Sequence, residues 1–285
     1  MEEPRGGRVI EDLKAVALEV RPLFYSCKLP TVYQVRLANI LPPPSALLGS
    51  LYKAYATYTG LDFEQGYARF LESVVYAGFA LLPRSAAPIA VCRFQLLLKH
   101  HEFRGGEGHR SDAMLRGFVF TDGLLVALLL TTLPQADYEK LKESAALIEY
   151  LSNSESLVHA RLLECSLRGF DAQRDADGYV AQIVASEASK FPLVGIVEQC
   201  GVMPEEAGGS REPHEVIYVW QPLKPIQGKR DFYEPVRACD INLGVYRRVL
   251  TVELGERRSK LIAVVDYFES IKASVKRSKR SSGLR

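Results

Sequence analysis

Three consecutive prolines, Pro42 to Pro44, place the strongest local limit on how this chain folds. A proline has no backbone N–H, so three in a row cannot pair within a sheet and must end any strand that precedes them. The apolar residues that follow, from Leu48 to Tyr55, have the spacing of an amphipathic helix, and Ser45 stands where a capping residue is expected. The sequence therefore predicts a strand region, a stiffened turn and a helix that begins near Ser45.

Strand patterns lie on both sides of the chain's helical middle. Residues 16–20 and 33–37 alternate apolar and polar side chains, which predicts two early strands. A weaker strand pattern covers 94–98, and the C-terminal third predicts strands at 216–220, 245–254 and 260–268, the last two joined by a hairpin turn. The apolar run Leu124–Leu130 is much shorter than the roughly 20 residues of a membrane span, so we expect a buried element there.

Helix patterns fill the region between these strands. After Asp62, which can cap a helix, apolar residues recur at helical spacing as far as Val75. Another helix is expected from Gln135 to Leu151, with Pro134 in its first turn. This order predicts an α+β fold, with an antiparallel sheet and helices on one face, of which the ferredoxin-like arrangement is the commonest small version.

The overall composition is that of a folded protein and identifies no ligand. Of the 285 residues 47% are hydrophobic, and 36 basic residues stand against 34 acidic ones, for a net charge of +2. The five cysteines are far apart, so neither a disulfide framework nor a zinc site is expected. The N-terminus has the pattern of neither a signal peptide nor a membrane anchor, and we expect a cytoplasmic protein.

Positive charge is concentrated in two segments. Residues 269–285 contain no acid after Glu269 and are expected to form a basic, flexible tail that is solvated or contacts nucleic acid. In the other segment, 93–116, aromatic residues Phe94, Phe103 and Phe118 alternate with cations, as in an arm that follows single-stranded nucleic acid, although a solvated loop has the same composition. The basic residues and histidines of this segment are Arg93, Lys99, His100, His101, Arg104, His109, Arg110 and Arg116.

The signatures of common catalytic sites are absent from the sequence. It has no phosphate-binding loop, no zinc-binding His-Glu-x-x-His and no Gly-x-Ser-x-Gly elbow, and we expect no metal and no cofactor. His100 and His101 are adjacent, so their side chains diverge and are unsuited to share a metal. A single histidine or Tyr33 could still act as the general base of a metal-independent endoribonuclease, which stays open as the alternative function.

The start of the predicted helix at Ser45 has two interpretations. Its first N–H groups, from Ala46 onward, can face outward at the positive end of the helix dipole and bind a phosphate, with Gly49 allowing a close approach. The same residues can equally form an ordinary capped helix packed on a sheet.

Three blocks of residues resemble one protein family. The segment Tyr33 to Arg36, then Leu41 to Leu47 and Gly49, resembles the N-terminal motif of the fifth numbered family of CRISPR-associated proteins, in its archaeal subtype I-A form. Ser111 to Met114 with Arg116, Phe120 and Thr121 resembles a second block of that subtype, and Glu155 to Leu157 a third. The proline block is fairly specific, and the other two are supportive.

The resemblance implies an RNA-binding fold related to the ferredoxin-like RNA-recognition module, with an inserted thumb. The expected organisation is a single RNA-binding domain over residues 1–268, with an inserted arm near 93–122, followed by the tail. The expected partners are the 5′ handle of a guide RNA, the backbone and large subunits of a surveillance complex, indirectly its target DNA, and no membrane. The residues expected to contact RNA are Tyr33, Gln34, Arg36, Ser45, Gly49, Lys99, His100, His101, Arg104, Arg110, Ser111 and Arg116.

The resemblance also implies that this chain has no catalytic residues. One branch of the family cuts precursor RNA with Tyr, Lys and His, whereas subtype I-A complexes usually leave that step to a separate endoribonuclease. The expected function is therefore a non-catalytic RNA-binding subunit in antiviral defence, and an assembly subunit that contacts only proteins is a third possibility.

Overall fold

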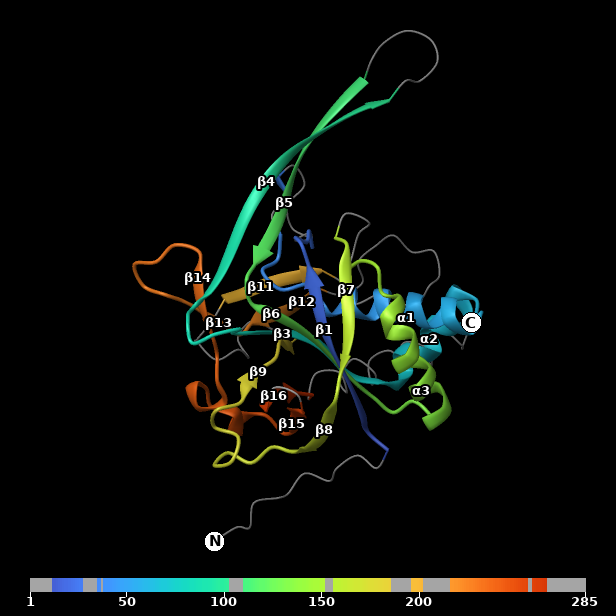
Figure 1. The fold of residues 1–285 in the computed structure, drawn as a ribbon, viewed down its shortest axis with the longest axis vertical. Coiled ribbons are helices and arrows are strands. Elements are labelled where there is room, and N and C mark those ends of the chain that lie inside the picture. The colour runs from blue at the N-terminus through green and yellow to red at the C-terminus, as the bar shows by residue number, and fades with distance from the viewer. Residues whose placement is uncertain are drawn as a thin grey trace, which may run out of the picture.

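The computed structural model describes residues 12–27, 35–36, 38–102, 110–151, 156–185, 196–201, 216–255 and 258–265. They form an α+β protein, as predicted, in which strands outnumber helices (Figure 1). In chain order the elements are β1 Lys14–Pro22, β2 Val35–Arg36, α1 Pro44–Thr59, α2 Phe63–Ser73, β3 Val74–Leu82, β4 Ile89–Glu102, β5 Arg110–Thr121, β6 Leu124–Thr131, α3 Gln135–Ser144, η1 Ala145–Leu147, β7 Val158–Leu163, β8 Cys165–Gly169, β9 Tyr179–Val180, β10 Ile183–Ala185, β11 Ile196–Gly201, β12 Val216–Gln221, β13 Leu223–Pro225, β14 Phe232–Pro235, η3 Ala238–Asp240, η4 Leu243–Val245, β15 Val249–Leu254 and β16 Ser259–Val264.

A central four-stranded sheet has the order β3-β6-β1-β7. Each neighbouring pair is antiparallel. Helices α1 and α2 connect β1 to β3, and α3 connects β6 to β7, so the central strands and helices follow one another as strand, helices, strand, strand, helix, strand. The helices pack together, since α1 contacts both α2 and α3, and they lie at one side of the sheet (Figure 1).

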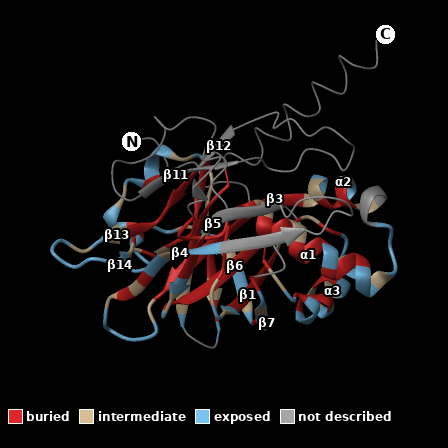
Figure 2. Ribbon diagram, turned by 90° about the horizontal axis from the view of Figure 1, so that it is seen from above, coloured by how far each residue is buried: buried red, intermediate tan, exposed pale blue. Residues whose placement is uncertain are grey.

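Two neighbouring strands of the central sheet, β3 and β6, are buried on both faces. Every residue of β3 and β6 is buried, although alternate residues of a strand point to opposite faces. Val252 of β15 and Leu261 of β16 belong to the same hydrophobic cluster as the central strands, so the C-terminal sheet β8-β15-β16-β9 supplies part of the cover. Buried residues fill the strands of the central sheet (Figure 2). This double cover explains the unbroken apolar run Leu124–Leu130, and the prediction of a buried element there is confirmed.

The start of α1 corrects the prediction of a Ser45 cap. The N-cap is Pro43, which offers no side-chain hydrogen bond, and the helix begins at Pro44. A proline at the first position is preset to the helical φ angle and has no N–H that needs an acceptor. At the other end Gly60 adopts a φ of 70°, and its N–H donates to the Ala56 carbonyl, which ends the helix.

Two further helix boundaries differ from the prediction. The helix after Asp62 ends at Ser73, and Val74 and Val75 begin β3, because β-branched residues suit the pairing with β6 and still match the helical spacing. The α-helix from Gln135 ends at Ser144 and continues only as a 3-10 turn to Leu147, short of the predicted end at Leu151.

A long hairpin, formed by β4 and β5, projects from the body (Figure 1). It includes the strand predicted over 94–98 and is paired from Val91 with Thr121 to Glu102 with Arg110. At about 3.4 Å per residue, the 14 residues of β4 extend for roughly 45 Å. The hairpin is inserted between β3 and β6, whose ends Leu82 and Leu124 lie opposite each other.

The C-terminal strands were predicted with bounds that are too long. The strand expected from residue 245 begins at Val249, because 243–245 form a 3-10 turn. The hairpin of β15 and β16 is confirmed, but β16 ends at Val264, and residues 266–268 lie outside the described ranges. Strand β8 ends at Gly169, and residues 170–178 connect it to β9.

The loop over residues 170–178 is held in place by a buried carboxylate. Asp175 has no exposed surface and accepts hydrogen bonds from both terminal nitrogens of Arg168, from the Asp171 N–H and from Thr251. Burial alone would raise the pKa of Asp175, but these hydrogen bonds outweigh it and lower the pKa to about 2. The charge is therefore retained inside the protein.

The two halves of the chain meet at Gln182, which is also fully buried. Its backbone N–H donates to the Phe79 carbonyl, and its Oε1 accepts from the Phe79 N–H, each at 2.9 Å. Its Nε2 donates to the Pro42 carbonyl at 3.0 Å and to Gln221 at 3.2 Å, and its own carbonyl accepts from Tyr76 at 2.7 Å. A single side chain thus connects the proline segment, the edge of β3 and strand β12.

Among the helices in the described ranges, none combines the length and the apolar character needed to cross a membrane.

We expect Asp175→Asn to remove a pH-dependent part of the stability. The pKa of Asp175 is lowered to about 2 from an ordinary value of 3.8, so the stabilisation is complete above about pH 4 and is lost as the pH falls toward 2. We expect the difference in unfolding free energy between wild type and variant, measured by urea unfolding, to be about 2 kcal/mol smaller at pH 2 than at pH 7. Asp231→Asn, at an exposed turn, is the matched control, and a gap that stays constant with pH would contradict the assignment.

Candidate nucleic-acid interface

The predicted RNA-contacting residues fall in two regions of the fold. Arg36 lies in β2, and Lys99, His100, His101, Arg110, Ser111 and Arg116 lie in the hairpin of β4 and β5. Ser45 and Gly49 lie in the first half of α1. Tyr33, Gln34 and Arg104 lie outside the described residues.

Strand β2 brings two distant sequence blocks together. It pairs in parallel with β5, and this places Arg36 at the register position of Arg116. On its other side Arg116 lies opposite Leu96 of β4. Two positions that are far apart in the sequence are therefore brought to one register position of the hairpin.

Farther along the hairpin, cationic and acidic positions alternate. His100 is paired with Asp112, and Arg110 is paired with Glu102. Lys99 and His101, by contrast, are paired with Ala113 and Ser111, which carry no charge. Lys99 and His101 are therefore at positions that do not face an acidic residue across the hairpin.

The aromatic residues of the hairpin do not all offer a surface for a base. Phe118 is only 3% exposed and packs edge-on against Phe24, at 5.3 Å between ring centroids, and in parallel against Phe94, at 5.7 Å. A ring enclosed in this way has no open face on which a base can stack. Phe120, two residues farther along β5, is 45% exposed. It belongs to the second block of the resemblance, but its sequence pattern did not predict that it stacks on RNA. Phe103 lies outside the described residues.

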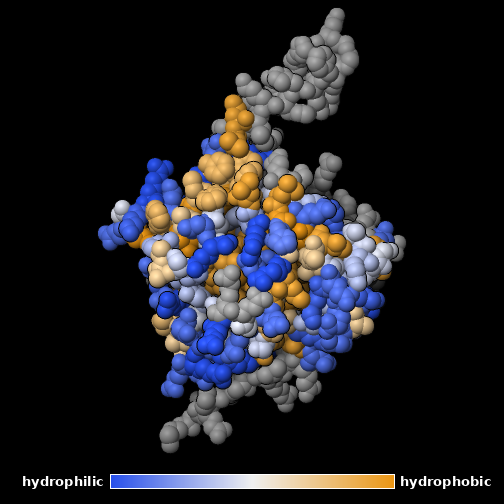
Figure 3. All heavy atoms as spheres, viewed as in Figure 1, coloured by the Kyte–Doolittle hydropathy of each residue, from blue (hydrophilic) through white to orange (hydrophobic). Residues whose placement is uncertain are grey.

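The lower half of the hairpin exposes apolar residues. Leu96, Leu97 and Phe120 are 44%, 54% and 45% exposed, and Leu23, just before the hairpin's root, is 74% exposed. Leu96 and Phe120 lie on one face of the hairpin and Leu97 on the other, because neighbouring residues of a strand point to opposite faces. We call Leu96 and Phe120, with Leu23 near the root, the apolar strip. Apolar surface gathers on this part of the molecule, whereas polar residues cover most of the body below it (Figure 3). Exposed apolar groups clustered in this way are typical of a surface that contacts another molecule.

The start of α1 is enclosed by the protein. Pro42, Pro43 and Pro44 are all buried, and the Pro42 carbonyl accepts from Gln182. The Ala46 N–H, predicted to face outward, instead donates to the Pro43 carbonyl at 2.9 Å. That part of the prediction is wrong, because the prolines fold back as a turn against the helix. Ser45 and Gly49 remain partly exposed, and their contact with RNA stays a prediction.

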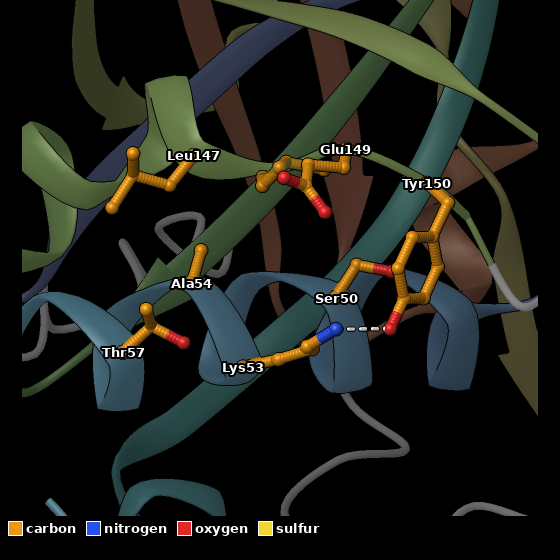
Figure 4. Close-up of a pocket in the computed structure, with 8 residues that line it drawn as sticks. Ser50, Lys53, Ala54, Thr57, Leu147, Glu149 and Tyr150 are labelled. Carbon is orange, nitrogen blue, oxygen red and sulfur yellow. Dashed lines mark hydrogen bonds between the residues drawn. The ribbon is translucent and has the colours of Figure 1, made fainter. Parts of the chain in front are cut away.

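A cleft of about 260 Å³ lies between α1 and residues 147–150 (Figure 4). Lys53 and Tyr150 meet across it through a hydrogen bond, and this bond raises the pKa of Lys53. Ser50, Thr57 and Glu149 supply the other polar groups.

The third sequence block has a structural role at Ser156. Its Oγ accepts the Ser26 N–H at 2.9 Å, and the residue is fully buried. Leu157 beside it is exposed, and Glu155 lies outside the described residues. The described ranges contain no cluster of three or more His, Cys, Asp or Glu residues that could hold a metal ion.

This chain shows only weak similarity to known proteins. No protein-family model and no curated protein matches the chain. A solved CRISPR protein from Archaeoglobus fulgidus is 13% identical, with a TM-score of 0.41, over 88% of this chain and 99% of that one. A chain of a CRISPR RNA-guided surveillance complex is 14% identical, with a TM-score of 0.37, over 78% of this chain and 91% of that one.

The protein Csc2 from Thermofilum pendens is 10% identical, with a TM-score of 0.26, over 53% of this chain and 65% of that one. All three TM-scores are below 0.5, so we infer neither the fold nor the function of this chain from these likenesses.

We expect Phe118→Ala and Phe120→Ala to act on different properties. Phe118→Ala should lower the unfolding free energy by about 3–5 kcal/mol, because it leaves a cavity between two rings. Phe120→Ala should change the unfolding free energy by less than about 1 kcal/mol and weaken binding of single-stranded RNA about fivefold or more, because it removes an exposed stacking surface. Urea unfolding and fluorescence anisotropy measure the two effects, and unchanged RNA affinity in Phe120→Ala would exclude a stacking role.

Proposed function

We propose that this chain is a non-catalytic, RNA-binding subunit of a type I-A CRISPR surveillance complex that holds the 5′ handle of the guide RNA. The observation that carries the proposal is the pairing of β2 with β5. It joins Arg36, from the first block that resembles the family, to Arg116, from the second, although the two are far apart in the sequence. Two motif blocks that meet on one surface are more consistent with a common ligand than two scattered matches.

The connectivity of the central sheet supports the same proposal. A strand, helix, strand, strand, helix, strand order with all neighbours antiparallel is that of the ferredoxin-like arrangement. We interpret the hairpin of β4 and β5 as the thumb inserted in that arrangement. RNA-recognition modules of this class hold single strands by aromatic stacking together with cationic contacts, and Phe120 and Lys99 lie on the hairpin.

The apolar strip favours a protein partner as well as RNA. Leu96 and Phe120, on one face of the hairpin, expose hydrocarbon that a monomer in water gains nothing by displaying. We propose that the hairpin contacts a neighbouring subunit through these residues, the backbone and large subunits being the expected candidates. A purely protein-binding role would rest on the same strip, and RNA binding separates the two functions.

We also propose that the chain does not cut RNA. Incubation of the purified protein with precursor RNA in chelator should leave the RNA intact, because metal-independent cleavage needs a base positioned at the ribose 2′-OH and a cation at the phosphate. Gel analysis of end-labelled precursor measures this. Cleavage at one position within the repeat would establish the endoribonuclease alternative.

The direct test compares guide RNA that carries an intact 5′ handle with RNA whose handle is scrambled. We expect tighter binding of the intact handle, and an affinity that falls as salt rises, because phosphate contacts release counterions. The combined variant Arg104→Ala, Arg110→Ala, Arg116→Ala should weaken binding at least tenfold and reduce the salt dependence. Fluorescence anisotropy over a salt series measures both.

Arg230→Ala provides the matched control for charge, since Arg230 lies on an exposed turn between β13 and β14. Unchanged affinity in the combined variant would remove the hairpin from the interface. Equal binding of both RNAs would show that the isolated chain does not select the handle, and no binding to either would favour the protein-assembly function.

A further inference from the structure

A buried glutamate lies near the end of the central sheet. Glu19 of β1 is fully buried, yet it belongs to a strand whose neighbours are almost all apolar. Burying a carboxylate is costly unless cations and hydrogen bonds compensate the lost hydration. Its position therefore calls for a physical reason beyond packing.

Two arginines provide the compensation. Arg21, two residues farther along β1, donates from Nε to one carboxylate oxygen of Glu19 at 2.6 Å. Arg161 of β7 donates from a terminal nitrogen to the other oxygen at 2.8 Å. Glu19 and Arg161 are directly paired across the strands, and Arg21 is paired with His159, so all four residues share one face of the sheet.

The arginines are held but not enclosed. The side chain of Arg21 is 50% exposed and that of Arg161 is 42% exposed, whereas the carboxylate between them has no exposed surface. Both guanidinium groups are therefore partly presented to solvent, while the buried carboxylate fixes their orientation from beneath. His159, also exposed, adds a further polar group beside them.

Stability alone does not explain why an ion pair, rather than apolar side chains, occupies these positions. Replacing buried ion pairs by apolar groups is often neutral or stabilising, and β1 is already surrounded by apolar residues. A carboxylate that fixes two arginines reduces the conformational entropy they lose when they bind a ligand. Guanidinium groups fixed in this way suit the oxygens of a phosphate.

We propose that Arg21 and Arg161, oriented by Glu19, form a phosphate-binding site for the backbone of single-stranded nucleic acid, separate from the hairpin. The site lies close to the hairpin's root, because Tyr25, four residues after Arg21, forms a bridge with Val119 of β5. At about 3.3 Å per residue, four residues extend for roughly 13 Å. A strand that follows the hairpin can therefore continue over this corner of the sheet. Only the choice of RNA as the natural source of the phosphate rests on the proposed function.

The test uses a labelled 20-nucleotide polyuridine strand without a handle, so that its result is independent of handle selection. Arg21→Ala should weaken binding about fivefold to tenfold at 0.15 M salt and lower the slope of log affinity against log salt by about 0.7, the value for one phosphate contact on a single strand. Arg21→Lys should recover only part of the affinity, because a lysine lacks the planar fork. Arg230→Ala is the matched control and should leave the affinity close to that of wild type.

Glu19→Gln separates orientation from charge. The substitution makes the chain more positive by one, so a role based on charge alone predicts tighter binding of the strand. If Glu19 orients the arginines, the same variant binds more weakly. Thermal unfolding verifies that the variant is folded, and if it is not, Arg161→Ala replaces it and should weaken binding in the same way as Arg21→Ala.

Two competition experiments show whether the site binds free phosphate or the phosphates of a nucleic-acid strand. Inorganic phosphate at millimolar concentration should compete only weakly, whereas unlabelled polyuridine should compete fully, because a strand contacts the site and the hairpin together. Wild-type affinity in both Arg21→Ala and Arg161→Ala, or no binding of polyuridine by wild type, overturns the inference. Binding of polyuridine that depends on Arg21, without selection of an intact handle, overturns the proposed function alone.

Discussion

The hydrogen bonds of Gln182 are the constraint on which the arrangement of the two halves depends. One buried amide, with its own backbone, pairs with the edge of β3 at Phe79, holds the carbonyl of Pro42 and contacts Gln221. The prolines cannot donate backbone hydrogen bonds, and the buried carbonyl of Pro42 needs a donor, which the C-terminal half supplies through Gln182. Loss of this side chain would leave several buried polar groups unpaired at once, and each of these carries a cost.

This constraint also positions the candidate interface. Helix α1 begins directly after the anchored prolines, and Ile40, just before them, accepts a hydrogen bond from Tyr25 at the hairpin's root. The proline segment, the hairpin and the end of β1 are therefore connected by short stretches of chain and direct bonds. A strand of nucleic acid bound along this side would meet groups whose relative positions are set by the core.

Local periodicity predicted the elements well where neighbouring residues decide the structure, as in Val16–Val20 and the apolar run of β6. It failed where distant residues decide. Val74 and Val75 fit a helix by spacing, but pairing with β6 makes them a strand. Phe118 and Phe120 look equivalent in sequence, yet only the approach of Phe24 buries one of them. Nothing near Glu19 in the sequence indicates Arg161, because the two meet only through the pairing of β1 with β7.

The way the hairpin is attached allows its length to change without a change in the core. The chain leaves the central sheet at Leu82 and re-enters it at Leu124, two residues that lie opposite each other in the same ladder. If two residues are added to or removed from each of β4 and β5, the strands stay in register and every remaining side chain keeps its face. The hairpin's reach can therefore drift over evolution while the sheet beneath it stays unchanged, so related chains could fit partners of different size through changes confined to one insertion.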